Sequence, residues 1–438
     1  MSAVLRSILR PLAVVRLVVG WGTYLMVLAL GAALHPPAPA PLLLSVLALI
    51  VGVILLCAFG VVHEAEALAR RLGDPYGSLV LTLSIVLIEV ILISAVMLGP
   101  GEHTTIARDS VMAVSMIILN LVIGLALLIG GSKHGGLRHN RTGTSAYLAM
   151  IVVLASLAFV LPALIGDGGA YTPRQEIPIV VMTVVVYRFF LQRQMGPQAS
   201  DFREVDPRLV GGIGAREQAA PEGRAEPVGR AEPPGGDAPA GGDVPAGGDA
   251  PAGGEVPAGG DAPAGGDAPA GGDVPAERPI GEILLENRSE ILVRIGLLVA
   301  TVLPIVLLSH HMAALLDDGL ARLGAPVALS GVLIAMIVFL PESITSLRAA
   351  IQGEIQRVSN LCHGALVSTV GVTIPAVLVI GLITNQRVVL AELPVNLLLL
   401  GVTVLLSVTT FAARRVTAIH GAAHLVVFGV YALALFAA

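Results

Sequence analysis

The sequence has few charged residues and few aromatic ones. Charged residues make up 13% of the 438 positions and aromatic residues 4%, with a single Trp. A soluble globular protein carries about 25% charged residues, so this composition excludes one compact water-soluble domain. The only two cysteines, Cys57 and Cys362, lie inside apolar runs, which excludes a disulfide scaffold and a cysteine-ligated zinc site. The basic residues are scattered along the chain, so nothing indicates nucleic-acid binding.

Hydrophobic residues make up 55% of the chain and are grouped in long runs. A bilayer core about 30 Å thick needs about 20 apolar residues per helix. Such runs predict eleven transmembrane helices, near 17–34, 43–62, 77–98, 110–131, 146–166, 177–192, 291–309, 326–348, 359–383, 393–412 and 418–436. The first run follows Arg6, Arg10 and Arg16 and could be a signal peptide, but it lacks a convincing small-residue cleavage site. The chain is therefore predicted to be an all-α polytopic membrane protein.

The distribution of Lys and Arg orients the predicted helices. If the N-terminus is cytoplasmic, only four of the 26 basic residues fall in outer loops: Arg108, Arg174, Arg322 and Arg387. The other basic residues lie in or beside inner segments, as the positive-inside rule predicts. A missed helix would reverse this bias in everything that follows it. We therefore predict a multi-pass protein of the inner (plasma) membrane, with its N-terminus in the cytoplasm and its C-terminus outside.

A stretch rich in Gly, Pro and Ala separates the sixth predicted helix from the seventh. From Gly235 to Ala276 it consists of seven copies of the hexapeptide GG(D/E)(A/V)PA. Such a composition buries too little apolar surface to offset the entropy of ordering. Residues 193–288 are therefore predicted to form a disordered cytoplasmic linker. Its evenly spaced acids could weakly concentrate cations, but a flexible tether is the favoured interpretation.

A weak internal repeat flanks this linker. The segment LARRLGDP (68–75) precedes the helix that contains Glu89, and LARLGAP (320–326) precedes the helix that contains Glu342. The predicted helices pair second with seventh, and so on to sixth with eleventh, which leaves the first unpaired. Because each unit has an odd number of spans, the two must cross the bilayer in opposite senses. The predicted parts are an N-terminal segment with the first helix (1–42), a first five-helix repeat (43–192), the linker, and a second five-helix repeat (289–438).

Glu89 and Glu342 are the only acids well inside a predicted span. An ionised acid at the centre of a membrane helix costs about 2.5–3.5 kcal/mol on insertion scales, which makes each one a functional candidate. Their matching places in the repeat favour function over a protonated structural acid. Pro341, just before Glu342, frees backbone carbonyls one turn back. Carboxylate, carbonyl and hydroxyl oxygens are the ligands that Ca²⁺ or Na⁺ prefers.

Other polar side chains are candidates for completing a cation site. The candidate secondary ligands are Ser84, Asn120, Ser343, Ser368 and Thr369. Of these, Asn120 and Ser368 occupy roughly matching repeat positions and could equally form helix–helix hydrogen bonds. A candidate cytoplasmic vestibule, which could also be a solvated face, consists of His63, Glu64 and Glu66. Packing is favoured over proton relay for three histidines in or near spans: His363, His420 and His424.

Three stretches resemble a known transporter family. They are HEAEALARRLGDPYGSLVLTLSIVLIEV (63–90), NLCHGALVSTVGVTIP (360–375) and HGAAHLVVFGVY (420–431). They resemble the bacterial ChaA-type calcium/proton antiporters of the cation/calcium exchanger superfamily. The resemblance implies one extra helix plus two inverted five-helix repeats, each with a motif glutamate that exchanges a cation for protons. Glu89 and Glu342 occupy those positions, but the residues before them depart from the superfamily's Gly-Asn-(Ala/Thr)-x-Glu motif.

We therefore expect a secondary antiporter that exchanges cytoplasmic Ca²⁺ for external protons at a shared two-glutamate site, with no cofactor. A site that holds either a metal ion or protons, but never both, couples the two flows. The alternative is a Na⁺(K⁺)/H⁺ antiporter with the same fold and site. A channel, which would carry current without proton counterflow, and an intramembrane hydrolase fit less well, and no enzyme is expected. The expected partners are inorganic cations, protons and the lipid bilayer; the sequence makes no prediction of the oligomeric state.

Overall fold

The computed structural model describes residues 11–31, 34, 39–72, 86–91, 93, 94, 97, 104–205, 288–326 and 328–437. Ten helices in these ranges are long and apolar enough to cross a membrane. In chain order they are α2 (Pro11–Ala29), α3 (Ala40–Leu72), α5 to α6 (Ile106–His134), α7 to α8 (Arg141–Ile165), α9 (Pro173–Met195), α12 (Arg288–Arg322), α13 (Ala328–Gln352), α14 to α15 (Ile355–Thr384), α16 (Pro394–Ala412) and α17 (Ala418–Ala437). The all-α fold is thereby confirmed, and the remaining predicted span, the third (77–98), lies mostly outside the described residues.

Two helices run well past their predicted ends. α3 has 33 residues and α12 has 35, whereas the apolar runs predicted 43–62 and 291–309. Hydropathy marks where a helix leaves the hydrocarbon, but the following residues in α3, HEAEALARRL, are mostly strong helix formers and contain no Gly or Pro. The helix therefore continues to the repeated LAR segment, which lies at the end of α3 and again at the end of α12.

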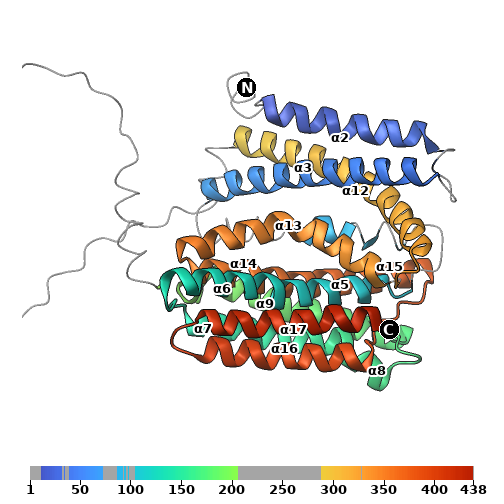
Figure 1. Ribbon diagram of the computed structural model, residues 1–438. Coiled ribbons are helices and arrows are strands. Elements are labelled where there is room, and N and C mark those ends of the chain that lie inside the picture. The colour runs from blue at the N-terminus through green and yellow to red at the C-terminus, as the bar shows by residue number, and fades with distance from the viewer. Residues whose placement is uncertain are drawn as a thin grey trace, which may run out of the picture. The chain divides into compact units, whose positions relative to one another are not determined.

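Helix packing in the membrane unit follows the predicted repeat. α3 packs along its repeat mate α12, with α2 against both, as the blue and yellow ribbons show in Figure 1. α17 packs along α6. Their repeat mates, α9 and α15, also pack against each other. α16 packs against α5, and its mate α7 packs against α14. The same neighbours therefore recur in both halves, as inverted repeats require.

The predicted inner and outer loops are gathered at opposite ends of the helices. Leu137 and Val416, in the loops after α6 and α16, exchange two backbone hydrogen bonds of 3.0 Å. The sequence predicts both loops on the inner side. At the other end, Leu390 N donates to Gly169 O at 3.0 Å, joining two loops assigned to the outer side. The alternation of crossings agrees with the sequence, and which end faces the cytoplasm stays a prediction.

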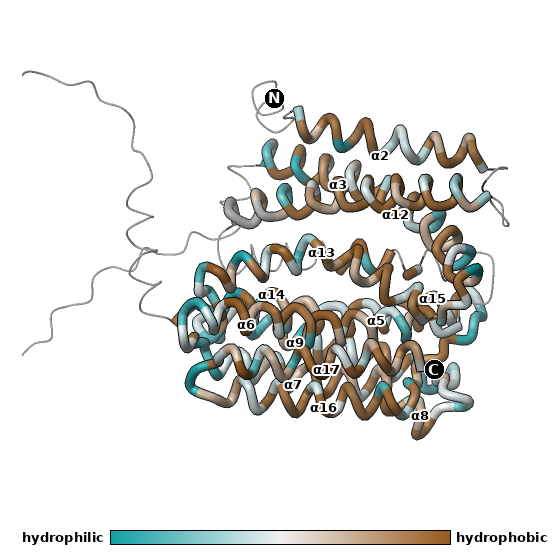
Figure 2. The backbone as a smooth tube through the Cα atoms, viewed as in Figure 1, coloured by the Kyte–Doolittle hydropathy of each residue, from teal (hydrophilic) through white to brown (hydrophobic). Residues whose placement is uncertain are grey.

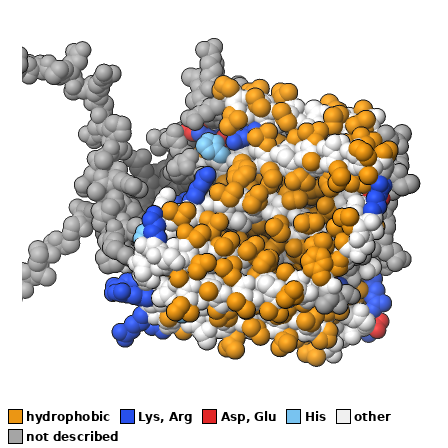
Figure 3. Space-filling view, viewed as in Figure 1, with side chains coloured by type: hydrophobic (Ala, Val, Ile, Leu, Met, Phe, Trp, Pro, Cys, Tyr) orange, Lys and Arg blue, Asp and Glu red, His pale blue; other side chains and the backbone are white. Residues whose placement is uncertain are grey.

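The surface of the helices is apolar along their middle and charged at their ends. Figure 2 shows hydrophobic residues along the helices, with hydrophilic residues gathered near the helix ends. In Figure 3, orange hydrophobic side chains cover the visible face and the blue Lys and Arg side chains lie at its edges. Leu28, Val181, Leu405 and Leu433 are among the exposed apolar residues. Such a continuous apolar surface fits contact with lipid.

Three of the membrane helices that the structure describes contain a π segment. These segments are η2 (Ile117–Val122), between α5 and α6; η3 (Ser156–Val160), between α7 and α8; and η5 (Thr369–Thr373), between α14 and α15. A π turn inserts one extra residue into the helix and is frequent at functional sites. η2 and η5 lie in helices that pair in the repeat, so the same helix of each half contains a π turn.

The start of the predicted linker is folded rather than disordered. After α9 a short 3₁₀ helix, η4 (Ala199–Phe202), places Phe202 against the rings of Tyr147 and Phe190. Asn360 Nδ2 donates to the Phe202 carbonyl at 2.6 Å, which anchors the segment to α14. Both membrane halves belong to one unit, Met1–Gly214 with Pro279–Ala438. Residues 206–287 lie outside the described residues, so disorder there stays a prediction.

A close contact between α6 and α17 depends on glycine. A Cβ atom on Gly421 would lie 2.5 Å from the Gly124 carbonyl oxygen and would also collide with the backbone of Leu128. Gly421→Ala is therefore expected to separate the two helices at a cost of about 1–3 kcal/mol, which a lower unfolding temperature in detergent would report. Gly429→Ala, on the same helix with open space around it, should leave that temperature unchanged. Equal melting of the two variants would contradict this packing.

Candidate functional site

Glu342 lies within α13, directly after Pro341, and is 5% exposed. Neither of its carboxylate oxygens has a hydrogen-bond partner among the described residues. Two nearby hydroxyl groups donate hydrogen bonds to backbone carbonyls of their own helix and not to the Glu342 carboxylate. Ser343 donates to the Phe339 carbonyl at 2.7 Å, and Thr345 donates to the Pro341 carbonyl at 3.0 Å. Ser343, a predicted secondary ligand, is therefore engaged with its own helix, and the Glu342 carboxylate is left open.

Glu89 lies in the helical stretch 86–91 and is 3% exposed. The Thr369 hydroxyl, at the start of η5, donates to Glu89 Oε2 at 2.6 Å. The other oxygen, Oε1, has no partner among the described residues. A hydroxyl of the second repeat thus holds a carboxylate of the first. Of the predicted secondary ligands that the structure describes, Thr369 is the one with a hydrogen bond to either glutamate.

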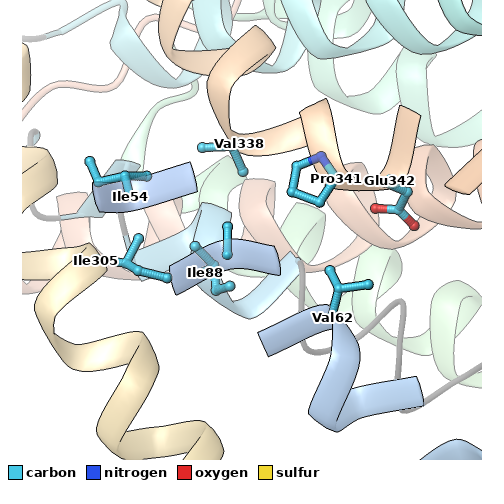
Figure 4. Close-up of a pocket in the computed structure, with 8 residues that line it drawn as sticks. Ile54, Val62, Ile88, Ile305, Val338, Pro341 and Glu342 are labelled. Carbon is cyan, nitrogen blue, oxygen red and sulfur yellow. The ribbon is translucent and has the colours of Figure 1, made fainter. Parts of the chain in front are cut away.

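The two glutamates lie close enough to interact. Glu342 is within electrostatic range of Glu89, and no ion pair joins either carboxylate to a Lys or Arg among the described residues. A small cavity of about 10 Å³ adjoins Glu342, and the other described residues that line it are apolar. Figure 4 shows Pro341 and Glu342 on one stretch of ribbon. Across the cavity lie Val62 of α3, Ile305 of α12, and Ile88, which is one residue before Glu89.

Among the described residues no positive charge compensates these two carboxylates, so the arrangement favours a bound cation or bound protons. Two buried carboxylates repel each other, and burying an unpaired charge costs several kcal/mol. Three of their four oxygens have no described partner. A cation bound between them, or a proton on each, removes the penalty. The site can therefore hold either species, and the carboxylate oxygens used by one are unavailable to the other.

The remaining predicted ligands are bonded to other groups or lie outside the described residues. Asn120, in η2, donates to Thr403 Oγ1 at 2.9 Å, and its oxygen lies 3.3 Å from His424 Nδ1, so it joins three helices. Ser368 accepts a hydrogen bond of 3.0 Å from the Tyr187 hydroxyl. Ser84 lies outside the described residues. The helix–helix interpretation of Asn120 and Ser368 thus fits their contacts.

One residue of the predicted vestibule, Glu64, forms an ion pair with a neighbouring helix. Glu64 Oε2 lies 2.7 Å from the Arg294 guanidinium, which also contacts Glu290 Oε1 at 3.1 Å. The pair joins α3 to α12 and neutralises Glu64, whereas His63 is exposed. The side chain of Glu66 lies outside the described residues. A role for these residues in admitting cations stays a prediction.

The intramembrane histidines have neighbours within the helix bundle. His363 Nδ1 lies 2.9 Å from Ser359 Oγ, and its ring packs edge-on against Phe411. His424 lies between Asn120 and Thr410, with Nε2 3.3 Å from the Thr410 hydroxyl. Among the described residues no group of three His, Cys, Asp or Glu side chains could hold a metal ion. The candidate cation site therefore depends on the glutamate pair with uncharged oxygens.

Two buried glutamates brought together from opposite repeats, in a bundle of membrane helices, are the features of an ion carrier. The sodium/calcium exchanger protein family matches this chain over residues 42–196 and 293–437. The chain belongs to this family. The resemblance to cation/calcium exchangers seen in the sequence is thereby confirmed, and the protein is a multi-pass membrane antiporter of inorganic cations.

Several relatives of this exchanger match nearly its whole length. The putative ionic transporter y4hA of Sinorhizobium fredii is 30% identical over 378 residues, covering 86% of this chain and 84% of that protein. The sodium-potassium/proton antiporter ChaA of Escherichia coli is 26% identical over 399 residues, covering 91% and 90%. The structure of native YfkE superposes with a TM-score of 0.62 at 14% identity, covering 97% of this chain and 100% of that one. The H⁺/Ca²⁺ exchanger CAX gives 0.60 at 13% identity, covering 96% and 87%. These likenesses confirm the exchanger fold.

Proposed function

We propose that this exchanger moves Ca²⁺ out of the cytoplasm in exchange for external protons, at one site formed by Glu89 and Glu342. The observation that carries the proposal is the pair of buried, interacting carboxylates with three oxygens that lack described partners. A divalent cation matches the charge of two carboxylates, and oxygen ligands are those that Ca²⁺ prefers. The positive-inside bias of the sequence supports a cytoplasmic location for the linker end of the helices, at the inner membrane.

Charge balance explains how such a site couples the two flows. With one Ca²⁺, or with a proton on each carboxylate, the site is neutral. Empty, it carries two negative charges that are costly to bury. A carrier whose loaded forms are neutral, and whose empty form is costly, changes its accessible side only when loaded. Ca²⁺ leaving on one side is therefore replaced by protons before the site can return.

A Na⁺(K⁺)/H⁺ antiporter with the same site is the second candidate. The relative named sodium-potassium/proton antiporter, at 26% identity, favours it. The residues before each glutamate, Leu87-Ile88 and Leu340-Pro341, differ from the motif of the wider superfamily. A monovalent ion would satisfy one carboxylate and leave the other to be protonated. The two candidates therefore differ in which ions release protons from the site.

An ion panel in everted membrane vesicles distinguishes these candidates. Respiration acidifies the vesicle interior, and CaCl₂, NaCl or KCl is then added outside while a fluorescent amine reports the pH gradient. We expect CaCl₂ to collapse the gradient in vesicles that contain the protein and not in vesicles that lack it. Collapse by NaCl or KCl alone would support the alternative and contradict Ca²⁺ exchange. A gradient that none of the salts changes would contradict proton antiport.

A further inference from the structure

A buried carboxyl group lies at the end of the helices opposite the linker. Glu392 is two residues before α16, and its side chain is 1% exposed. Its Oε2 accepts hydrogen bonds from Leu393 N at 3.1 Å and from Asn396 Nδ2 at 2.8 Å. Its Oε1 has no hydrogen-bond partner among the described residues. Glu392 precedes the predicted span 393–412, so a search for acids inside spans does not find it.

The charged groups around Glu392 leave it incompletely neutralised. Arg108 Nε lies 4.0 Å from Glu392 Oε1, but it is 2.8 Å from Asp109 Oδ1, to which it donates. Arg108 also donates to the Ala391 carbonyl at 3.2 Å. Tyr431 of α17 is within electrostatic range of both acids. The cluster thus has two carboxyl groups, one guanidinium and one phenol, and its arginine is committed mainly to Asp109.

The cluster lies just beneath the surface. The side chains of Arg108 and Asp109 are 15% and 18% exposed, whereas that of Glu392 is 1% exposed. Water therefore reaches Arg108 and Asp109, and Arg108 Nε lies 4.0 Å from the buried Glu392 carboxyl group. Burial raises the pKa of the Glu392 carboxyl; the Asn396 amide and Arg108 act against this rise, and Asp109 adds to it. The group therefore exchanges protons closer to neutral pH than an ordinary glutamate does.

Polar side chains also occur deeper in the bundle, on α17 and η2. Tyr431 and His424 are seven residues apart on α17, which places them on the same helix face. His424 pairs with Asn120 in η2, and η2 packs against α13, the helix that carries Glu342. The corresponding residue of the other repeat, two residues before α7, is the buried His139, whose Nε2 lies 2.9 Å from the Phe411 carbonyl oxygen.

We propose that Glu392 binds protons that arrive from the side opposite the linker and delivers them toward the glutamate pair. The inference rests on the proposed proton antiport and adds a second proton-binding residue to it. The Arg108–Asp109 pair lies beside the carboxyl group, and Oε1, which has no described hydrogen-bond partner, is the atom that takes the proton. In protonated form Glu392 is neutral and can release its proton inward, after which the ionised form is held by Asn396 and Arg108.

The test separates proton delivery from cation binding. Purified protein is reconstituted in liposomes, and two rates are measured: exchange of ⁴⁵Ca²⁺ for unlabelled Ca²⁺ at equal pH, and exchange of Ca²⁺ for protons at varied pH on the side opposite the linker. Wild-type Ca²⁺/H⁺ exchange should rise as that pH falls through the raised pKa of Glu392. For Glu392→Gln we expect that rise to disappear and the rate at acid pH to drop about tenfold, while the Ca²⁺/Ca²⁺ rate stays within twofold of wild type.

Two further variants serve as controls. Glu392→Asp keeps a carboxyl group and should restore most of the pH dependence. Glu354→Gln, at the start of α14 on the linker side, removes a more exposed acid paired with Arg357 and should match wild type in both assays. An unchanged pH profile in Glu392→Gln, or equal loss of both exchange rates, would overturn the inference. Failure of the proposed Ca²⁺/H⁺ exchange would appear in the wild type itself; the comparison of variants is then made with Na⁺, and a wild type that moves no protons with either ion would overturn both.

Discussion

Glu342→Gln and Glu89→Gln are each expected to lower cation-driven proton movement at least a hundredfold. Glutamine has nearly the volume of glutamate but cannot ionise, so it can neither release a proton to an incoming cation nor balance its charge. One remaining carboxylate leaves a divalent ion with an uncompensated charge in a buried site, which costs several kcal/mol. The measurement is the collapse of the pH gradient in everted vesicles on addition of CaCl₂, with ⁴⁵Ca²⁺ uptake as a second readout.

Ser343→Ala is the matched control for this loss. Ser343 follows Glu342 directly, but its hydroxyl donates to the Phe339 carbonyl within the same helix. Removing that hydroxyl should leave transport near the wild-type rate. Wild-type transport in either glutamine variant would rule out a shared two-glutamate site, and a loss in Ser343→Ala as large as in Glu342→Gln would show that α13 tolerates no change there.

Thr369→Val is expected to weaken the apparent affinity for the transported cation by about 10- to 100-fold. The Thr369 hydroxyl donates a hydrogen bond of 2.6 Å to Glu89, and it is the described group that fixes this carboxylate. A hydrogen bond to a charged group contributes about 1.5–3 kcal/mol, and each 1.4 kcal/mol is a factor of ten in affinity. The cation concentration that gives half-maximal collapse of the pH gradient measures the change. Thr369→Ser, which keeps the hydroxyl, should recover most of the affinity.

Thr373→Val makes the corresponding change without the hydrogen bond. Thr373 lies four residues further along, at the end of η5, and is fully buried like Thr369. Its hydroxyl has no partner among the described residues. Valine should therefore be accepted there with unchanged cation affinity. If both valine variants lose affinity equally, the effect belongs to the packing of η5 and not to the bond with Glu89.

The sequence predicted those features that the bilayer imposes on a chain. A helix that spans lipid must be apolar over about 20 residues, so the spans could be counted from hydropathy. Loops that carry Lys and Arg stay inside, so alternate crossings could be checked. Acids inside spans are costly, so the positions of Glu89 and Glu342 within apolar runs were enough to identify them as candidates. Each of these features follows from a local pattern.

The features that the sequence did not predict depend on contacts between distant segments. The ion pair between Glu64 of α3 and Arg294 of α12 joins residues that lie 230 positions apart in the sequence. The π segments leave no clear mark in hydropathy. Thr369 was one of several possible ligands until the fold placed it at Glu89. Phe202 looked like part of a linker because only its partners, Tyr147 and Phe190, show that it is buried.

The small size of the cavity beside Glu342 has a consequence for ion choice. Its volume of about 10 Å³ corresponds to roughly one water molecule. An ion that reaches the carboxylates in this conformation must therefore shed almost its entire hydration shell. Mg²⁺ dehydrates reluctantly, whereas Ca²⁺ accepts irregular oxygen coordination. Dehydration thus sets Mg²⁺, the smaller and more tightly hydrated ion, at a disadvantage before any ligand distance is considered.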